Sequence, residues 1–132
     1  MNTIHEADRR VHPVWARVLA VFWVAMSLSI VAVAISSDLI GRPLWWADED
    51  RWSTPMLYVL GVTLVSPSVL SIAFCLTRNR WVQWGAWSVG VELGVLALLD
   101  RHDSPGSAVV LAALAVAAAL AGVATLSARV RN

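Results

Sequence analysis

Charge is scarce in this chain. Charged residues make up 14% of the 132 positions and apolar residues 58%, and the mean hydropathy is +0.67. A soluble domain carries about 25% charged and about 45–50% apolar residues. A solvated globular surface of the usual kind is therefore excluded, and the composition predicts a membrane protein.

Cysteine and closely spaced histidines are also lacking. Cys75 is the sole cysteine, so an internal disulfide and a cysteine metal site are excluded, and we expect a core thiol. His5, His12 and His102 are spread between the N-terminal segment and a loop, without the pairing that a zinc or iron site needs. We interpret them as solvated residues and expect no metal and no cofactor.

Catalytic and nucleic-acid-binding motifs are missing. The chain contains no nucleophile elbow, phosphate-binding glycine loop, pair of catalytic carboxylates or metalloprotease helix motif. Its net charge is +1, and no basic patch is interleaved with aromatic residues. We therefore expect neither an enzyme nor a nucleic-acid partner.

Long apolar runs are what the sequence contains instead. A membrane helix needs about 20 mostly apolar residues. Four segments qualify, over residues 18–36, 56–76, 81–99 and 107–128. The first exceeds the roughly 7–15 residues of a signal-peptide core, so we expect it to be retained. Short connections favour antiparallel neighbours, and the sequence predicts one all-α membrane domain over residues 1–132, an antiparallel four-transmembrane-helix bundle in a lipid bilayer.

Helix punctuation supports these boundaries. Pro13 can open the first helix early, and the Gly-Arg-Pro sequence at 41–43 ends it. Ser104 followed by Pro105 resembles an N-cap and a first-turn proline.

Arginine placement predicts the orientation, since positively charged loops stay cytoplasmic. One side holds seven arginines, namely Arg9, Arg10, Arg17, Arg78, Arg80, Arg129 and Arg131. The other side holds three, Arg42, Arg51 and Arg101, together with most of the acidic residues. We expect both termini in the cytoplasm (N-in/C-in) of a bacterium and the helices in its plasma (inner) membrane.

The longest connection is the outer loop, residues 37–55, in which three tryptophans surround an acidic trio at 48–50. Such a loop could place its indoles in the headgroup region, or it could be a docking loop for a cation or a partner; we favour the first interpretation. The predicted interfacial anchors are Trp15, Trp45, Trp46, Trp52, Trp81 and Trp84.

Glu92 lies near the middle of the third apolar run, within the sequence WSVGVELGVLALL. A carboxyl group at that depth costs a few kcal/mol on insertion scales and by default indicates a functional site facing the bundle interior. No predicted span contains a basic residue to pair with it. We therefore expect Glu92 to be protonated and to donate a hydrogen bond.

Depth along the helices suggests partners for this acid. Glu92 lies seven residues, about 10 Å, from the outer end of its span, and the same count selects Thr63 and Ser29 on the two preceding spans. Pro67 cannot donate to the Thr63 carbonyl and should leave it free. The hypothesis is an intramembrane polar node of Glu92, Thr63, Ser66, Pro67 and Ser29. It is either structural glue between helices or a protonatable working site.

Small residues occupy another side of the third span. Ala86, Gly90, Gly94 and Ala97 follow helical spacing, and Gly90 with Gly94 forms a GxxxG pair that permits close helix approach. This packing face fits contact within the chain or a dimer interface.

The absence of lysine and the heavy use of alanine, valine and tryptophan favour a GC-rich source. The four-span plan resembles small multidrug transporters, but that family carries its essential glutamate in the first span, whereas Glu92 is in the third. The plan is also similar to small holin-like and holin-associated proteins of actinobacteria and their phages, and to accessory subunits of membrane complexes. These resemblances rest on topology and composition, not on a motif.

Two classes of function follow. The first is a non-enzymatic protein that acts through helix–helix association, as an accessory subunit or a holin-like or regulatory protein, with a homo-oligomer or a larger membrane complex as its partner. The alternative is a small proton-coupled transporter or channel in which Glu92 is the protonatable group.

Overall fold

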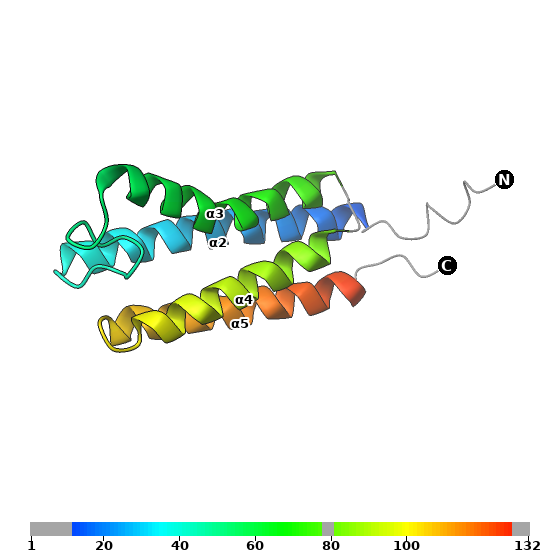
Figure 1. Cartoon of the computed structure of the whole chain (residues 1–132). Helices are drawn as coiled ribbons and strands as arrows, with labels where there is room; N and C mark the ends of the chain where they lie inside the picture. The colour runs from blue at the N-terminus through cyan, green and yellow to red at the C-terminus, as the bar shows by residue number, and fades with distance from the viewer. Residues whose placement is uncertain (1–11, 78–80, 128–132) are drawn as a thin grey trace.

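Four long helices make up most of the computed structural model, which describes residues 12–77 and 81–127. They are α2 (Pro13–Leu39), α3 (Thr54–Leu76), α4 (Val82–Asp100) and α5 (Pro105–Ser127). The described ranges contain no strand. The helices run antiparallel in a bundle (Figure 1), which confirms the predicted fold class.

Helix ends follow the prolines and the glycine that the sequence singled out. Pro13 opens α2, and the Val14 amide donates to Nδ1 of His12 at 3.4 Å. Gly41 adopts φ +70° just after α2, a left-handed conformation that glycine reaches without a steric penalty. Pro105 opens α5. Because proline is tolerated in a first helical turn, α2 begins five residues before the predicted span.

Each helix is long and apolar enough to cross a membrane, by length and composition. α4, the shortest, has 19 residues and α2 has 27, or about 28 and 40 Å of helix. Each also carries outward valines, such as Val21, Val62, Val91 and Val109, that are 69–70% exposed. An apolar surface of this kind suits contact with lipid chains.

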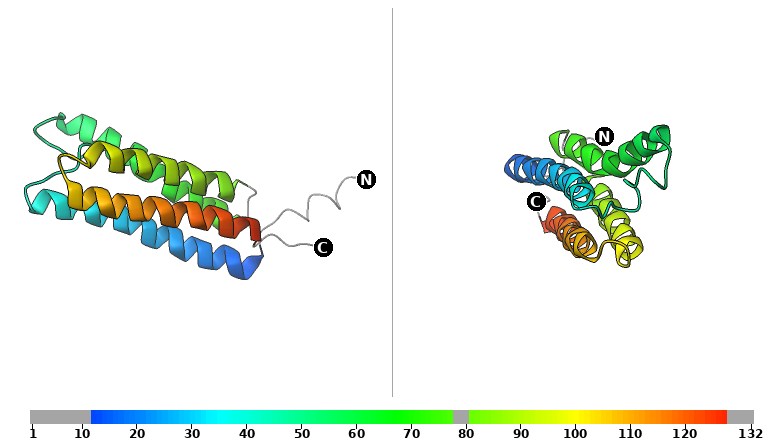
Figure 2. Two further views of the ribbon diagram at one scale, coloured as in Figure 1. Left: turned by 90° about the horizontal axis from the view of Figure 1, so that it is seen from below. Right: turned by 90° about the vertical axis from the view of Figure 1, so that its left-hand side faces the viewer.

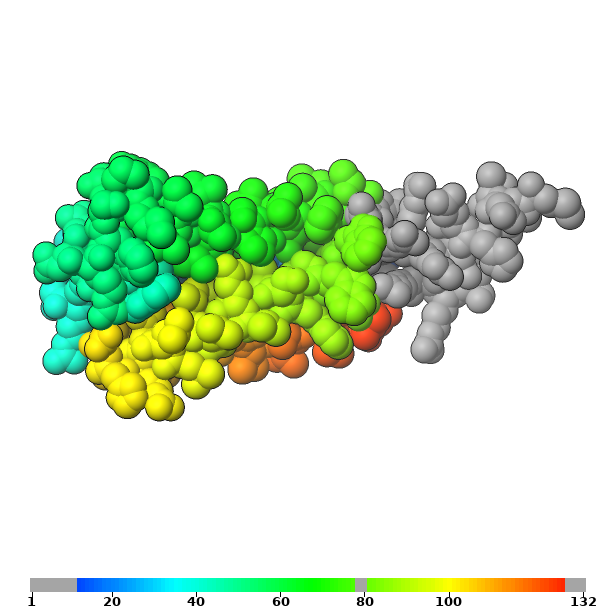
Figure 3. All heavy atoms as spheres, in the orientation of Figure 1, coloured from blue at the N-terminus to red at the C-terminus, as the bar shows by residue number. Residues whose placement is uncertain are grey.

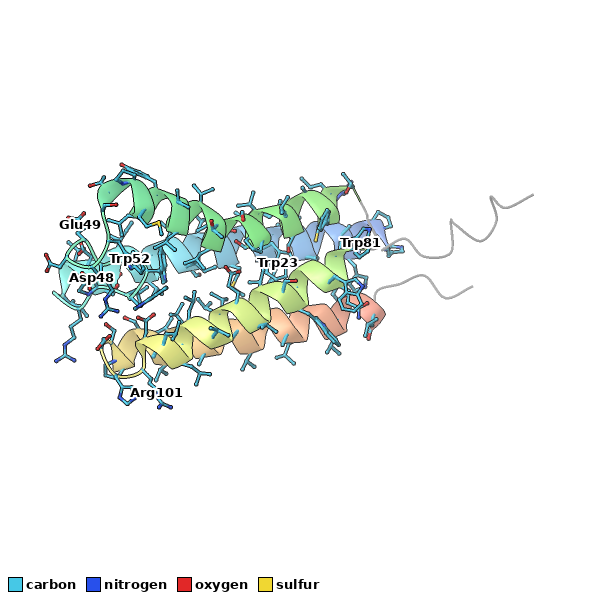
Figure 4. The ribbon with its side chains drawn as sticks, viewed as in Figure 1. Trp23, Asp48, Glu49, Trp52, Trp81 and Arg101 are labelled. Carbon is cyan, nitrogen blue, oxygen red and sulfur yellow. The ribbon has the colours of Figure 1, made fainter. Side chains whose placement is uncertain are left out.

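The bundle consists of two helical hairpins. The backbones of α4 and α5, and those of α2 and α3, approach each other over the longest stretches. The α3–α4 and α2–α5 approaches are shorter, and the diagonal pairs have no close backbone approach. Figure 2 shows the same pairing from two other directions. Trp23 is fully buried in the hydrophobic core (Figure 4), together with Ile30, Leu93 and Leu111.

α3 is the least buried of the four helices. Its buried residues are Ser68, Ser71 and Cys75, all small. Pro67 lies inside the helix, and α3 bends near its middle (Figure 1), as a missing amide donor permits. Figures 1 and 2 show that α3 and α4 diverge towards the end at which residues 41–53 lie.

The start of α2 and the end of α5 lie at the same end of the bundle (Figure 1). Seven arginines predict which side is cytoplasmic, and the structure describes one of them, Arg17, which lies 4 residues after the first residue of α2. The other six lie outside the described residues: Arg9, Arg10, Arg78, Arg80, Arg129 and Arg131.

Candidate functional site

Glu92 lies one residue beyond the midpoint of α4 and is partly buried. Within the described residues it has no hydrogen bond and no ion pair. Gly85 lies seven residues earlier, two helical turns, and so shares its side of α4. Gly85 contacts α3, which places Glu92 on the side of α4 towards α3 rather than towards α5.

The hydroxyl groups of the predicted polar node bond within their own helices. Ser29 donates to the Ala25 carbonyl at 2.8 Å and Thr63 to the Val59 carbonyl at 2.7 Å. No hydrogen bond joins either side chain to Glu92 in the described part of the chain. In helices, serine and threonine hydroxyls readily reach the carbonyl three or four residues earlier.

The Thr63 carbonyl, expected to be a free acceptor opposite Glu92, has a local partner instead. Ser66 Oγ donates to it at 3.0 Å. Pro67 removes the amide donor, as predicted, and the hydroxyl one residue before the proline replaces that donor. The node hypothesis therefore requires correction at this point, because Ser66 satisfies the acceptor intended for Glu92.

The polar contacts that do join helices involve other serines. Ser27 Oγ of α2 lies 3.0 Å from Ser68 Oγ of α3, and Ser68 is buried. Each hydroxyl also lies within hydrogen-bond distance of a carbonyl of its own helix, Trp23 or Val65. This pair joins the first hairpin near the middle of the bundle.

A third serine lies at the contact between the two hairpins. Ser71 of α3 is fully buried, and its hydroxyl donates to the Pro67 carbonyl at 2.9 Å. A Cβ added to Gly85 of α4 would lie 2.7 Å from Ser71 Oγ. The missing side chain at Gly85 thus lets α4 approach α3 at this level.

The predicted small-residue face packs inside the chain. Ala86 and Ala97 are buried, and a Cβ on Gly90 would lie 3.4 Å from the Ala115 carbonyl of α5. Gly94, by contrast, has open space where its Cβ would be. The α4–α5 contact therefore uses Gly90 of the GxxxG pair and not Gly94.

α5 contributes a glycine of its own to this contact. Gly122 is buried, and a Cβ there would overlap the indole of Trp87 on α4. Trp87 is 44% exposed, so one part of its ring covers Gly122 while another faces outward. The ring also forms an edge-on pair with Trp84, with centroids 6.3 Å apart.

Residues 41–53, the loop cap, fold over one end of the bundle. Leu44 is fully buried and Trp46 is 6% exposed. The prediction that Trp46 is an interfacial anchor is therefore wrong, because its ring packs in the core of the protein. Trp45 and Trp52 stack edge to face at 5.4 Å, and Trp52 Nε1 donates to the Trp45 carbonyl at 2.9 Å. Figure 4 shows Trp52 beside the acidic tip at Asp48 and Glu49.

Asp100, the last residue of α4, holds the loop cap in place. It is fully buried, and its Oδ1 accepts a hydrogen bond from the Trp45 amide at 2.6 Å. Its Oδ2 is buried without a hydrogen-bond partner among the described residues. A carboxylate at a helix C-terminus also opposes the helix dipole. Only the contact with the loop cap offsets these costs in the described structure.

Ser104 provides the second attachment. Its hydroxyl donates to the Arg42 carbonyl at 2.9 Å, while its own carbonyl accepts the first amide bond of α5, from Ala108. The residue thus has the N-cap position that the sequence predicts, but its side chain reaches the loop cap. Arg51 adds an exposed ion pair with Asp103 at 3.8 Å, a type that contributes about 0–1 kcal/mol.

Three of the predicted interfacial tryptophans are exposed at the opposite end. Trp15 is 49% exposed, Trp81 48% and Trp84 60%. Figure 4 shows Trp81 at the end of α4 far from the loop cap. Their common level suits a membrane boundary, whereas Trp45 and Trp52 are partly covered by each other.

Sequence reasoning missed Trp23, Ser27, Ser68 and Asp100. Asp100 stands in the same charged run as Asp103, and nothing in the sequence distinguishes the buried acid from the exposed one. For Ser27 and Ser68 a signal existed, since each lies on a buried helical side in the pattern of apolar neighbours. Glu92 is charged and was therefore predicted to join helices, but the neutral pair of Ser27 and Ser68 makes the interhelical contact.

The fold and these contacts define a small protein of four helices, each long and apolar enough to cross a membrane. Comparison of the chain with protein-family models, with curated proteins and with solved structures finds no match.

Proposed function

We propose that this chain is a non-enzymatic protein of the bacterial plasma membrane that acts through helix–helix association, as an accessory or regulatory subunit of a membrane complex. The observation that carries the proposal is Glu92, an acid halfway along α4 without a hydrogen bond or ion pair in the described residues. Intramembrane acids normally pair with another polar group. A contact outside the described chain would supply that group.

The other candidate interface, the small-residue face of α4, already packs against α5 of the same chain. GxxxG pairs often join membrane helices of separate chains, but here Gly90 and Gly122 bring α4 and α5 of one chain together. This leaves the side of α4 that carries Glu92 for an external helix. Within the same proposal, both termini are cytoplasmic, because seven of the ten arginines lie on their side.

Association can be measured by fluorescence energy transfer in lipid vesicles. Donor- and acceptor-labelled copies of the full chain would be diluted with lipid, alone and with the membrane proteins encoded by neighbouring genes. With one of these partners, we expect energy transfer to persist when the sample is diluted with lipid. The substitution Glu92→Leu should reduce this energy transfer. Val91→Leu, one position away on an exposed site, is the matched control. Transfer that is the same for both variants would contradict a role for Glu92.

Self-association on a large scale would support the holin-like form of the proposal. A holin-like protein forms large oligomers and depolarises cells when it is overproduced. An accessory subunit is harmless alone and purifies with one stable partner. Membrane potential during overproduction, together with the size of the detergent-purified protein, distinguishes these two forms.

A proton-coupled transporter is the second candidate, supported by the same half-buried acid near the midpoint of α4. Proton flux into liposomes with an internal pH dye would then depend on Glu92, and Glu92→Gln would abolish it with the fold preserved. Equal flux from the wild type, Glu92→Gln and empty liposomes would leave association as the function.

A further inference from the structure

The edge of α4 that carries Glu92 is exposed along most of its length. Ser88, Val95 and Leu99 lie on the same side, one to two turns away, and all three are exposed, Val95 and Leu99 by about half. On α3, Phe74 contacts Gly85 of α4. Thr63 lies 11 residues before Phe74, about three helical turns, and therefore lies on the same side of α3, towards α4. We call this line, Thr63 with Ser88, Glu92, Val95 and Leu99, the Glu92 seam.

The seam opens where the two hairpins separate. α3 and α4 are in contact at Ser71 and Gly85 and diverge from there towards the loop cap. In the space-filling view of Figure 3, α3 and α4 together form one long face of the molecule. A further helix lying along this face would contact both hairpins and would cover Glu92.

The four described helices offer no cation for this position. Arg17 is the only basic residue in the four helices, and it lies near the start of α2, a helix whose backbone does not closely approach that of α4. Glu92 lies about 15 Å from the start of α4, whereas Arg17 lies about 6 Å from the start of α2. A second copy would bring the same helices, and therefore no cation at the depth of Glu92.

Charge complementarity thus selects the occupant. We propose that the Glu92 seam binds a transmembrane helix of a different protein that carries one arginine or lysine near the middle of its span. At that depth neither charge reaches water easily, so pairing removes the cost of leaving each alone in hydrocarbon. The hydroxyls of Ser88 and Thr63 lie along the same seam and offer further acceptors to the cation. The proposal rests on the proposed function, association through Glu92.

A synthetic helix tests it directly. The full chain, labelled with a donor dye at Glu49→Cys in a Cys75→Ser background, would be placed in phosphatidylcholine vesicles. The probe is a 23-residue leucine–alanine helix with a single central arginine and an acceptor dye. Matched probes carry glutamine at the centre, or the arginine four residues from one end. Energy transfer is measured as a function of the ratio of probe to lipid.

We expect the central-arginine probe to bind about tenfold more tightly than the glutamine probe, equivalent to about 1.4 kcal/mol. Glu92→Gln should remove this preference, and the probe with the displaced arginine should lack it. Asp103→Asn, which neutralises an exposed acid outside the helices, should leave the preference intact. Should Glu92→Gln not fold, judged by circular dichroism, the comparison of the three probes on the wild-type chain still decides the result.

Equal binding of the arginine and glutamine probes would overturn the proposal that the partner helix carries a cation. Energy transfer between copies of the chain that needs Glu92 but no probe would also overturn it, because the seam would then bind a second copy; association through Glu92 would stand. If Glu92→Gln changes neither probe binding nor self-association, both this inference and the proposed function fail.

Discussion

At the scale of single residues, one serine hydroxyl joins two helices and a near neighbour does not. Ser27 contacts Ser68 across the α2–α3 boundary, whereas Ser29, two positions later, bonds only the Ala25 carbonyl of its own helix. Interhelical hydrogen bonds in membranes contribute about 0.6–2 kcal/mol. The same chemical group therefore differs in energetic role according to the side of the helix on which it lies.

Ser27→Ala should lower the free energy of unfolding in detergent by about 1 kcal/mol, because Ser68 loses its partner on α2. Ser29→Ala should change it by less than about 0.5 kcal/mol. Denaturation in sodium dodecyl sulfate, followed by tryptophan fluorescence, measures both variants. Equal losses would contradict the assignment of the interhelical contact to Ser27.

Asp100 and Asp103 provide a second matched pair. Asp100→Ala should destabilise the protein by about 1–3 kcal/mol, because the Trp45 amide loses its acceptor, the buried Asp100 carboxylate. Asp100→Asn should lose less, since its amide oxygen can still accept that hydrogen bond. Asp103→Ala, at an exposed residue, should stay within about 0.5 kcal/mol of the wild type.

Thermal unfolding in detergent measures these three variants, and quenching of tryptophan fluorescence by iodide reports whether the loop cap has opened. Asp100→Ala should expose Trp46, which is buried in the wild type. An unchanged quenching profile together with unchanged stability would contradict attachment of the loop cap through Asp100.

At the scale of helices, glycine decides how closely α4 and α5 pack. Gly122→Ala should destabilise the pair by about 1–3 kcal/mol, because the new methyl group overlaps the Trp87 indole. Gly94→Ala should be neutral or slightly stabilising, since its Cβ meets open space. Unfolding in detergent again provides the measurement.

A double variant separates this clash from a general effect of alanine. In Trp87→Ala with Gly122→Ala, the ring that causes the overlap is absent, so the two losses should not add. Additive losses would show that Gly122 matters for a reason other than its contact with Trp87.

Helices were predictable from the sequence because four apolar runs and their flanking prolines determine them almost alone. The fold class followed for the same reason, and so did the packing of Gly90 against α5, whereas that of Gly94 did not. The polar node did not, because Ser29, Thr63 and Ser66 each have a carbonyl of their own helix within reach, and sequence does not reveal which acceptor a hydroxyl takes. Trp46 was misplaced because loop packing depends on contacts distant in sequence, such as that of Trp45 with Asp100.

At the scale of the whole molecule, orientation is the property that arginine placement predicts most strongly. A green fluorescent protein fused after Asn132 should fluoresce in the cytoplasm, whereas alkaline phosphatase inserted at Glu49 should be active outside it. Removing positive charge tests whether the arginines determine this orientation. Replacing Arg78 and Arg80 by glutamine should increase the fraction of molecules inserted in the opposite orientation, whereas the control Arg42→Gln should not. Fluorescence and phosphatase activity with the opposite pattern would contradict the predicted topology.

The loop cap also has a consequence for the order in which the protein is made. Residues 41–53 leave the ribosome about 50 residues before Asp100 and Ser104, the two side chains that hold them. The hydrogen bonds that hold the loop cap can therefore form only after both of these side chains have been made. Attachment of the loop cap is thus a late event in biogenesis, and it marks a chain whose synthesis has passed the end of α4.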